Sequence, residues 1–224
     1  MPHSRSASIV LSVAVAAAAV GGCYRNAQRG AVIGAGGGAV VGGAIGAATG
    51  STAKGAIIGA VVGGAAGAII GDQMDRQAKE IDQNIPGATV ERVGEGINVT
   101  FASGLLYDFD SDVVKATAQE NLRELARSLE KYPKSNVLIV GHTDSVGSDS
   151  YNEALSQRRS RAAADFLAAQ GVARSRIDAR GLGEREPVAA NDSESGRQQN
   201  RRVEVAIFAS PQYRDEVKRQ AGGR

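Results

Sequence analysis

Residues 137–147 have the sequence VLIVGHTDSVG and decide the fold around them. Four consecutive aliphatic residues at 137–140 predict a strand inside a sheet, because a strand that is covered on both faces needs no polar alternation. The Gly and the polar residues that follow predict that the strand ends at a loop. Asp144 lies on this loop, so the sequence predicts a fixed carboxylate at the end of a buried strand.

Two amphipathic segments flank this strand. Residues 113–132 carry apolar side chains on one helical face and end before Pro133. Ser150 and Glu153 form a capping-box pattern, which predicts the start of a second helix that ends near Gly171. The sequence therefore predicts one helix before the central strand and one after it.

Four further segments have the composition and the length typical of strands. They are residues 89–93 and 97–101, which form a hairpin pattern around Gly-Glu-Gly, and residues 177–180 and 202–208. The last segment alternates its side chains and is expected to be half-buried. Together these elements predict an α+β domain over residues 86–210, long enough to bury a core. Residues 211–224 are expected to form a loose helix or a disordered end.

The charge balance and the few Cys and His residues exclude several functions. The chain has 26 Lys and Arg against 24 Asp and Glu, a net charge of +2, which argues against nucleic-acid binding through bulk positive charge. Its single Cys excludes an internal disulfide, and one Cys with two His is too few for a His/Cys zinc site. We therefore expect no nucleic-acid partner, no metal site and no cofactor.

The N-terminal residues have the pattern of a secretory signal peptide. Residues 1–22 contain a short basic start, an apolar run from Ile9 to Val20, and small residues before Cys23. The apolar run is shorter than the roughly 20 residues that a membrane-spanning helix needs. This segment therefore predicts export rather than a permanent span.

The sequence VGGC at 20–23 resembles the bacterial lipobox. The resemblance implies that Cys23 is the first mature residue, that it is acylated, and that residues 23–29 are a lipidated N-terminus. Several acyl chains anchor a protein stably in a lipid membrane. Tyr24 stands where lipoproteins retained at the inner membrane tend to have Asp, so the resemblance implies an outer-membrane location, facing the periplasm.

Residues 30–71 are rich in glycine and form two similar halves. Gly recurs at every fourth position from 30 to 50 and again from 55 to 71, and the halves contain GAVIGA and GAIIGA. This spacing places the glycines on one helical stripe, where two helices can approach closely. The segment resembles the glycine-zipper domain of envelope lipoproteins, which favours a packed helical pair that needs lipid, its other half or a second copy. A flexible linker is the alternative, and whether the segment crosses a bilayer stays open.

Residues 72–85, DQMDRQAKEIDQNI, are charged but keep an apolar stripe of Met74, Ala78, Ile81 and Ile85. This pattern predicts that the second glycine helix continues through them and ends before Pro86. We expect a polar helical stalk that leads away from the membrane.

Six motifs between residues 107 and 204 resemble the C-terminal domain of OmpA, which the peptidoglycan-associated lipoprotein shares. They are YDFDS at 107–111, GHTDSVG at 141–147, YNEALSQRR at 151–159, GLGE at 181–184, Pro187, and NRRVE at 200–204. The resemblance implies a mixed sheet with two main helices on one face. It also implies non-covalent binding of a peptidoglycan stem peptide, without catalysis.

The diaminopimelate side chain of such a peptide ends in an ammonium and a carboxylate, so its binder needs a fixed anion and a fixed cation. The resemblance implies that Asp144 binds the ammonium and that Arg159 binds the carboxylate. A planar guanidinium suits this task because it binds a carboxylate through two parallel hydrogen bonds. Further binding residues are implied at Asp108, Thr143, Asn152, Leu155 and Arg201.

Three alternatives stay open. In the first, Asp144 and Arg159 pair with each other as a surface salt bridge and bind no ligand. In the second, the glycine segment drives assembly of a membrane-associated homo-oligomer, and wall binding only positions that oligomer. In the third, the carboxylates of Asp108 and Asp110 act as the catalytic pair of a wall hydrolase. We expect no catalytic residues in this chain. His142 is expected to be a side chain at the end of the sheet.

Overall fold

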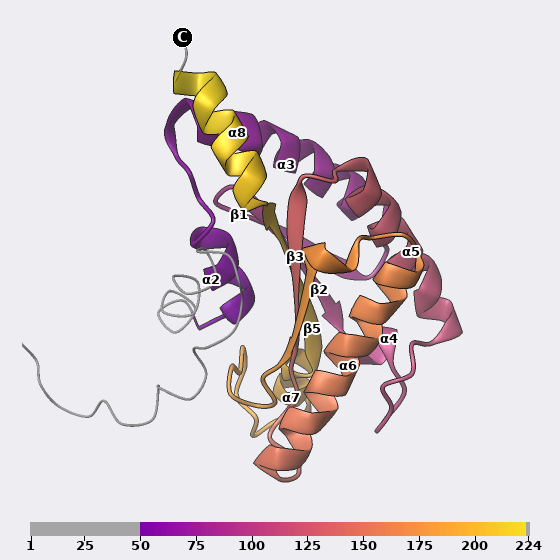
Figure 1. Ribbon diagram of the computed structural model, residues 1–224. Helices are drawn as coiled ribbons and strands as arrows, with labels where there is room; N and C mark the ends of the chain where they lie inside the picture. The colour runs from indigo at the N-terminus through magenta and orange to yellow at the C-terminus, as the bar shows by residue number, and fades with distance from the viewer. Residues whose placement is uncertain (1–49, 223–224) are drawn as a thin grey trace, which may run out of the picture. The chain divides into compact units, whose positions relative to one another are not determined.

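A five-stranded mixed sheet is the central element of this computed structural model, which describes residues 50–222 (Figure 1). The strands are β1 (Ala88–Val93), β2 (Gly96–Ala102), β3 (Ser135–Gly141), β4 (Ile177–Gly181) and β5 (Arg202–Ala209), in the order β1-β2-β5-β3-β4. All neighbours are antiparallel except β3 and β4. The predicted α+β class and all five strands are confirmed.

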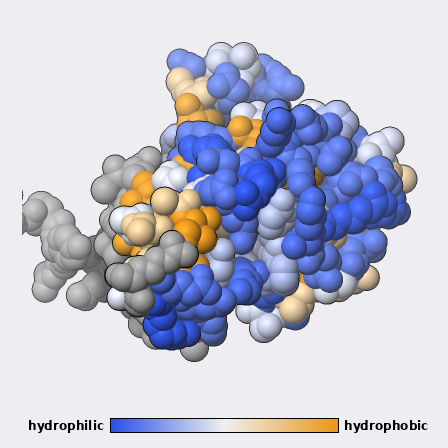
Figure 2. All heavy atoms as spheres, turned by 90° about the horizontal axis from the view of Figure 1, so that it is seen from above, coloured by the Kyte–Doolittle hydropathy of each residue, from blue (hydrophilic) through white to orange (hydrophobic). Residues whose placement is uncertain are grey.

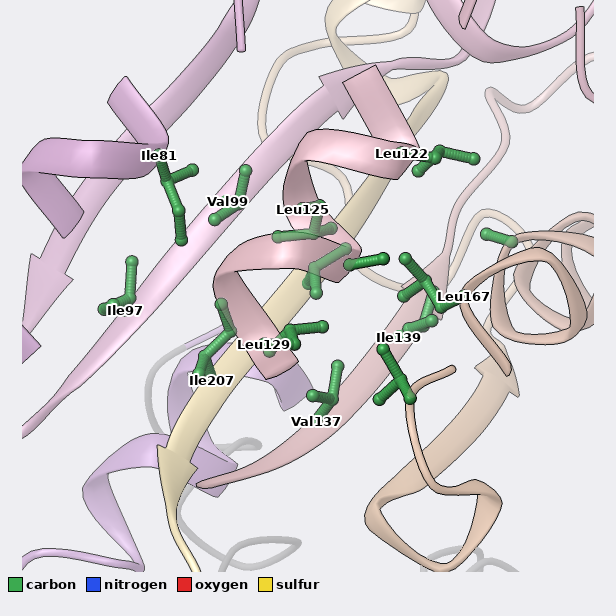
Figure 3. Packing of buried hydrophobic residues seen from close by; sticks show 14 of the residues in the cluster. Ile81, Ile97, Val99, Leu122, Leu125, Leu129, Val137, Ile139, Leu167 and Ile207 are labelled. Carbon is green, nitrogen blue, oxygen red and sulfur yellow. The ribbon is translucent and has the colours of Figure 1, made fainter. Parts of the chain in front are cut away.

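One face of the sheet is covered by the two main helices that the sequence predicts. They are α5 (Ala116–Lys131) and α6 (Asp149–Ala169). Figure 3 shows the labelled side chains of this core: Leu122, Leu125 and Leu129 of α5 and Leu167 of α6 beside Val137, Ile139 and Ile207 of the sheet. All of them are almost completely buried. The start of α6 differs from the prediction, because Ser148 rather than Ser150 caps it and accepts from the backbone N–H of Tyr151.

The opposite face of the sheet carries the short helix α2 (Thr52–Ile58) (Figure 1). Its buried residues Ala53 and Ile57 pack against Leu138, Val140 and Ala206. The expectation that the last strand is half-buried is therefore wrong, because helices cover β5 on both faces. A strand that is covered on both faces does not need polar side chains at every second position.

Residues 72–84 belong to α3 (Gly64–Asn84), which ends before Pro86 as predicted. The prediction that this helix is a stalk leading away from the membrane is wrong, because Met74, Ala78 and Ile81 are buried in the same core as α5. The side-chain amide of Gln77, in the same helix, donates to Ser128 of α5 at 3.2 Å. The apolar stripe of this segment therefore packs on the domain and does not lead away from it.

The second half of the glycine segment does not form one continuous helix. Residues 59–63 separate α2 from α3, and Gly63 and Gly64 both have positive φ angles, of 75° and 60°. One glycine of the stripe, Gly67, lies directly against the domain, since a Cβ there would lie 2.0 Å from the carboxylate of Glu95, whereas a Cβ at Gly63 would meet nothing within 4 Å. That carboxylate accepts hydrogen bonds from the backbone N–H groups of Val62 and Gly63, at 2.8 and 2.7 Å.

Large apolar side chains remain exposed along this region, at Ile58, Val61 and Ile69. On the face drawn in Figure 2, most of the surface is hydrophilic and apolar areas are few. Within residues 50–222, none of the helices combines the length and the apolar character that crossing a membrane requires. The signal peptide 1–22, Cys23, residues 23–29 and the first glycine half up to residue 49 lie outside the described residues.

The remaining helices complete the domain. They are α4 (Ser103–Leu106), the 3₁₀ helix η1 (Arg174–Arg176), α7 (Glu194–Asn200) and α8 (Pro211–Gly222). The predicted loose tail is an ordered helix over 211–222, because Tyr213 and Val217 join the main core beside α3.

Candidate functional site

Asp144 and Arg201 meet at one end of the sheet. β3 ends and β5 begins there, since the two strands are antiparallel and Gly141 lies opposite Val203. Nη1 of Arg201 is 2.5 Å from Oδ2 of Asp144. The other carboxylate oxygen of Asp144 accepts from the backbone N–H of Val146 at 3.1 Å. Asp144 is 7% exposed, so this predicted carboxylate is fixed and nearly buried.

Two glycines let α6 lie directly against the ends of β3 and β4. A Cβ at Gly141 would lie 2.4 Å from the carbonyl oxygen of Ser156, and a Cβ at Gly181 would lie 2.2 Å from the backbone nitrogen of Gln157. Oγ of Ser156 also accepts from the backbone N–H of Gly183 at 2.9 Å. This close contact brings the α6 face that carries the predicted binding residues to the end of the sheet.

Arg159 lies on α6 and is held by the loop that follows Tyr107. Its Nε donates to the carbonyl of Ser111 at 2.8 Å and its Nη2 to the carbonyl of Asp108 at 3.3 Å. The ring of Tyr107 lies 5.4 Å from the guanidinium carbon. Arg159 is 6% exposed, and burial lowers the pKa of this guanidinium. Among residues 50–222, no carboxylate forms an ion pair with Arg159.

The alternative of a direct Asp144–Arg159 salt bridge is wrong, because Asp144 pairs with Arg201 instead. Asn152 connects the two regions: its Nδ2 donates to the carbonyl of Val146 at 3.2 Å. Asn152 and Arg159 are seven residues apart on α6, which corresponds to about 10 Å along the helix. Within residues 50–222, one end of the domain therefore holds an anion, Asp144, that is ion-paired, and a cation, Arg159, that is not, on a loop and on α6 respectively.

The other predicted binding residues fall into two groups. Thr143, Asn152 and Leu155 are buried, and Oγ1 of Thr143 has no hydrogen-bond partner within the described part of the chain. Asp108 differs from the expectation, because its carboxylate is exposed and pairs with Lys115 at 3.4 Å. Only the backbone carbonyl of Asp108 contacts Arg159.

Sequence reasoning did not find the roles of Tyr151 and Glu194. The hydroxyl of Tyr151 donates to the carboxylate of Asp110, a residue with a positive φ of 52°, and thereby fixes the loop over Arg159. Glu194 of α7 binds Arg201 at 2.6 Å, and hydrogen bonds from Arg201 and Arg197 lower the pKa of this carboxyl. The motifs assigned neither residue a binding role: the partner of Tyr151 is 41 residues away, and Glu194 lies in none of the six motifs.

His142 lies buried where β3 ends. As predicted, His142 packs at the end of β3, 1% exposed, and its ring nitrogens form no hydrogen bond within residues 50–222. Burial lowers its pKa well below the ordinary value, so the imidazole is neutral near pH 7. No cluster of His, Cys, Asp and Glu able to hold a metal ion occurs in the region that the structure describes.

Comparison with known proteins matches two regions of the chain. Residues 106–201 match the OmpA family, and residues 3–75 match the YMGG-like Gly-zipper. The structure of the cell wall anchor of the T6SS from Pseudomonas aeruginosa has a TM-score of 0.53 at 34% identity, over 61% of this chain and 97% of that one. A MotB-like protein from Desulfovibrio vulgaris, at 22% identity and a TM-score of 0.59, shares the fold over 65% of this chain and 94% of that one.

Several curated proteins are similar in sequence. The peptidoglycan-associated lipoprotein of Brucella melitensis is 37% identical over 121 residues, which cover 54% of this chain and 72% of the relative. The probable lipoprotein YiaD of Escherichia coli is 37% identical over 62% of this chain and 64% of its own length. Outer membrane porin F of Pseudomonas fluorescens is 48% identical over 47% of this chain, but the match spans only 32% of the porin. By these matches and by its fold, the chain belongs to the OmpA family.

Proposed function

We propose that this chain is a lipid-anchored protein of the outer membrane that binds peptidoglycan non-covalently and tethers the membrane to the cell wall. One observation carries the proposal: Arg159 is a nearly buried cation with no carboxylate partner among residues 50–222, and Asn152 of the same helix bonds the loop that carries the fixed carboxylate of Asp144. Several relatives, at 37% identity, are named peptidoglycan-associated lipoproteins, which supports it. The anchor is the acylated Cys23, and the domain faces the periplasm.

The proposed ligand is the diaminopimelate side chain of a stem peptide. Arg159 has donors left over after its two bonds to loop carbonyls, and these can bind the ligand carboxylate. Asp144 is the acceptor for the ligand ammonium and already shares its charge with Arg201. A hydrogen bond to a charged group contributes about 1.5–3 kcal/mol. Two such contacts, less the cost of ordering the peptide, support modest affinity per site.

The lipid anchor compensates for modest affinity. A domain that is tied to the membrane stays near the wall, so each rebinding event is effectively intramolecular. We propose no chemical step, cofactor or metal for this activity. We do not propose the hydrolase alternative, since Asp108 and Asp110 are exposed and lie two residues apart on one loop.

The experiment is co-sedimentation of the full chain, purified in detergent, with sacculi that contain diaminopimelate. We expect Arg159→Ala and Asp144→Asn each to weaken binding at least about tenfold, since one charged contact is lost. Arg161→Ala is the matched control, because Arg161 is exposed on the same helix. If both site variants bind sacculi as well as the control does, the proposed site is wrong.

Assembly through the glycine segment is the second candidate function, because residues 3–75 match a glycine-zipper family. A test of assembly must leave the residues from Ser51 onward unchanged, because they pack on the domain. Replacing only residues 30–49 by a polar linker of equal length leaves α2 in place. A tether keeps its function after this change, whereas a zipper-driven homo-oligomer loses its assembly on size-exclusion chromatography.

A further inference from the structure

The sheet face opposite α5 and α6 is an interaction surface that α2 occupies. Ala53 and Ile57 of α2 are buried there beside Val140 and Ala206. Gly96 of β2 shapes this surface, because a Cβ there would lie 2.4 Å from Cγ2 of Ile57. The surface therefore fits a short helix with a small residue and an isoleucine four positions apart.

Two carboxylates hold the start of α2 on this surface. Oγ of Ser51 donates to Oε2 of Glu204 at 2.9 Å. Thr52 donates to Glu186 through its backbone N–H at 3.0 Å and through its hydroxyl at 2.6 Å. Glu204 is itself 3% exposed and accepts from Nε of Arg202 at 2.7 Å. Charge-assisted hydrogen bonds are strong and directional, so they fix α2 in one position.

Glu204, which holds α2, and Arg201 of the candidate site both lie at the start of β5. Arg201 binds Asp144, whereas its neighbour Arg202 binds Glu204. Arg202 and Glu204 lie two residues apart on β5 and therefore point to the same face of the sheet, whereas Arg201 precedes the strand and binds Asp144 on the loop after β3. The backbone N–H of His142 donates to the carbonyl of Arg202 at 2.9 Å and joins the end of β3 to the start of β5.

We propose that docking of α2 on this surface controls the candidate site. While α2 is seated, the ends of β3 and β5 present Asp144 and Arg201; release of α2 loosens both ends and weakens wall binding. The wall-binding part of this proposal rests on the proposed function. A site that is competent for only a fraction of the time has an apparent affinity reduced by that fraction.

The structure allows α2 to leave while the main core stays folded. The buried residues of α2 belong to a separate apolar cluster, distinct from the cluster that α3, α5 and α6 share. Five residues, 59–63, lie between α2 and α3 and include Gly63 in a left-handed conformation. Release therefore requires a change in the connector, in the contacts with Glu204 and Glu186, and in the ion pair of Lys54 with Glu91, and not in the helices over the other face.

Two matched variants of the full chain test this proposal. Ala53→Glu places a charge at a position that is 0% exposed, and releases α2. Ile58→Glu makes the same addition on the same helix at a side chain that is 37% exposed, and leaves α2 seated. Hydrogen exchange reports the protection of residues 52–58 and of residues 142–148, and co-sedimentation with diaminopimelate-containing sacculi reports affinity.

We expect Ala53→Glu to lose protection in both segments and to bind sacculi about fivefold more weakly or worse, within the usual range of coupling between two sites. Ile58→Glu is expected to match the unmodified chain. Lost protection at 52–58 with unchanged protection at 142–148 and unchanged affinity would overturn the proposal, as would a lack of protection at 52–58 in the unmodified chain. If the unmodified chain does not bind sacculi, the proposed function fails, and exchange at 142–148 still decides whether α2 controls the strand ends.

Discussion

The hydroxyl of Tyr107 donates a 2.6 Å hydrogen bond to the backbone carbonyl of Arg159, and its ring lies 5.4 Å from the guanidinium carbon of the same residue. Tyr107 is 2% exposed, and burial raises the pKa of its hydroxyl, which therefore stays protonated as a donor. One aromatic side chain thus fixes both the backbone and the charged end of Arg159.

We expect Tyr107→Phe to lower the free energy of unfolding by about 1 kcal/mol, because a buried carbonyl loses its donor while the ring keeps its packing. Urea denaturation measures the change. Tyr132→Phe is the control, since that hydroxyl donates to Glu80 in a less buried place and its loss is expected to cost less. Equal stability of Tyr107→Phe and the unmodified chain would show that the bond contributes nothing.

Arg159→Lys is expected to fold normally and to bind sacculi about tenfold more weakly. A lysine keeps the positive charge, but it lacks the planar fork that binds a loop carbonyl and a ligand carboxylate together. Co-sedimentation against sacculi measures the loss. If this variant binds sacculi as well as the unmodified chain, the positive charge alone, and not the planar guanidinium, binds the ligand.

Gly141→Ala is expected to destabilise the domain by about 1–3 kcal/mol, because the added Cβ would lie 2.4 Å from the backbone oxygen of Ser156 and α6 must shift. Gly104→Ala is the matched control, since a Cβ there meets nothing within 4 Å. Urea denaturation compares the two variants. A loss as small as that of Gly104→Ala would contradict the close contact between β3 and α6.

His142 predicts a loss of stability in mild acid. Burial, with the nearby charge of Arg202, lowers its pKa well below 6.5, whereas Glu204 at 3.8 Å acts in the opposite sense and does not prevail. The unfolded chain takes up a proton near pH 6.5 and the folded chain does not. The contribution of the neutral His142 to the free energy of unfolding is therefore fully present above pH 6.5. It decreases as the pH falls below 6.5, by up to about 1.4 kcal/mol per pH unit.

Urea denaturation at about pH 7.5 and about pH 5.5 measures this dependence. In His142→Asn the titrating group is gone, so the difference between the two pH values is expected to shrink. An equal difference in both proteins would assign the acid sensitivity to other groups.

Local patterns predicted the strands and the two main helices well, because alternation, apolar runs and Gly or Pro boundaries are properties of the chain itself. They failed for Met74 and Ile81, whose apolar stripe fits a stalk as well as a helix packed on a domain. The partner of an apolar face depends on the tertiary fold. The same limit applies to β5, which α2 covers from a position about 150 residues earlier in the chain.

The candidate site shows a similar division. Motifs identified Asp144, Arg159 and Arg201, but only the antiparallel pairing of β3 with β5 brings Arg201 onto Asp144. The contact of Asp108 through its carbonyl could not be foreseen, since a motif names a residue and not the atom that it uses. Glu194 belongs to no motif that the sequence singled out, and its role follows from its distance to Arg201 alone.

The most direct measurement is an experimental structure of the chain with a stem-peptide fragment that contains diaminopimelate. The account predicts the side-chain carboxylate of diaminopimelate within hydrogen-bond distance of the Arg159 guanidinium, and its ammonium within the same reach of the Asp144 carboxylate. A peptide bound at another surface, or held here with neither group on Arg159 or Asp144, would contradict it.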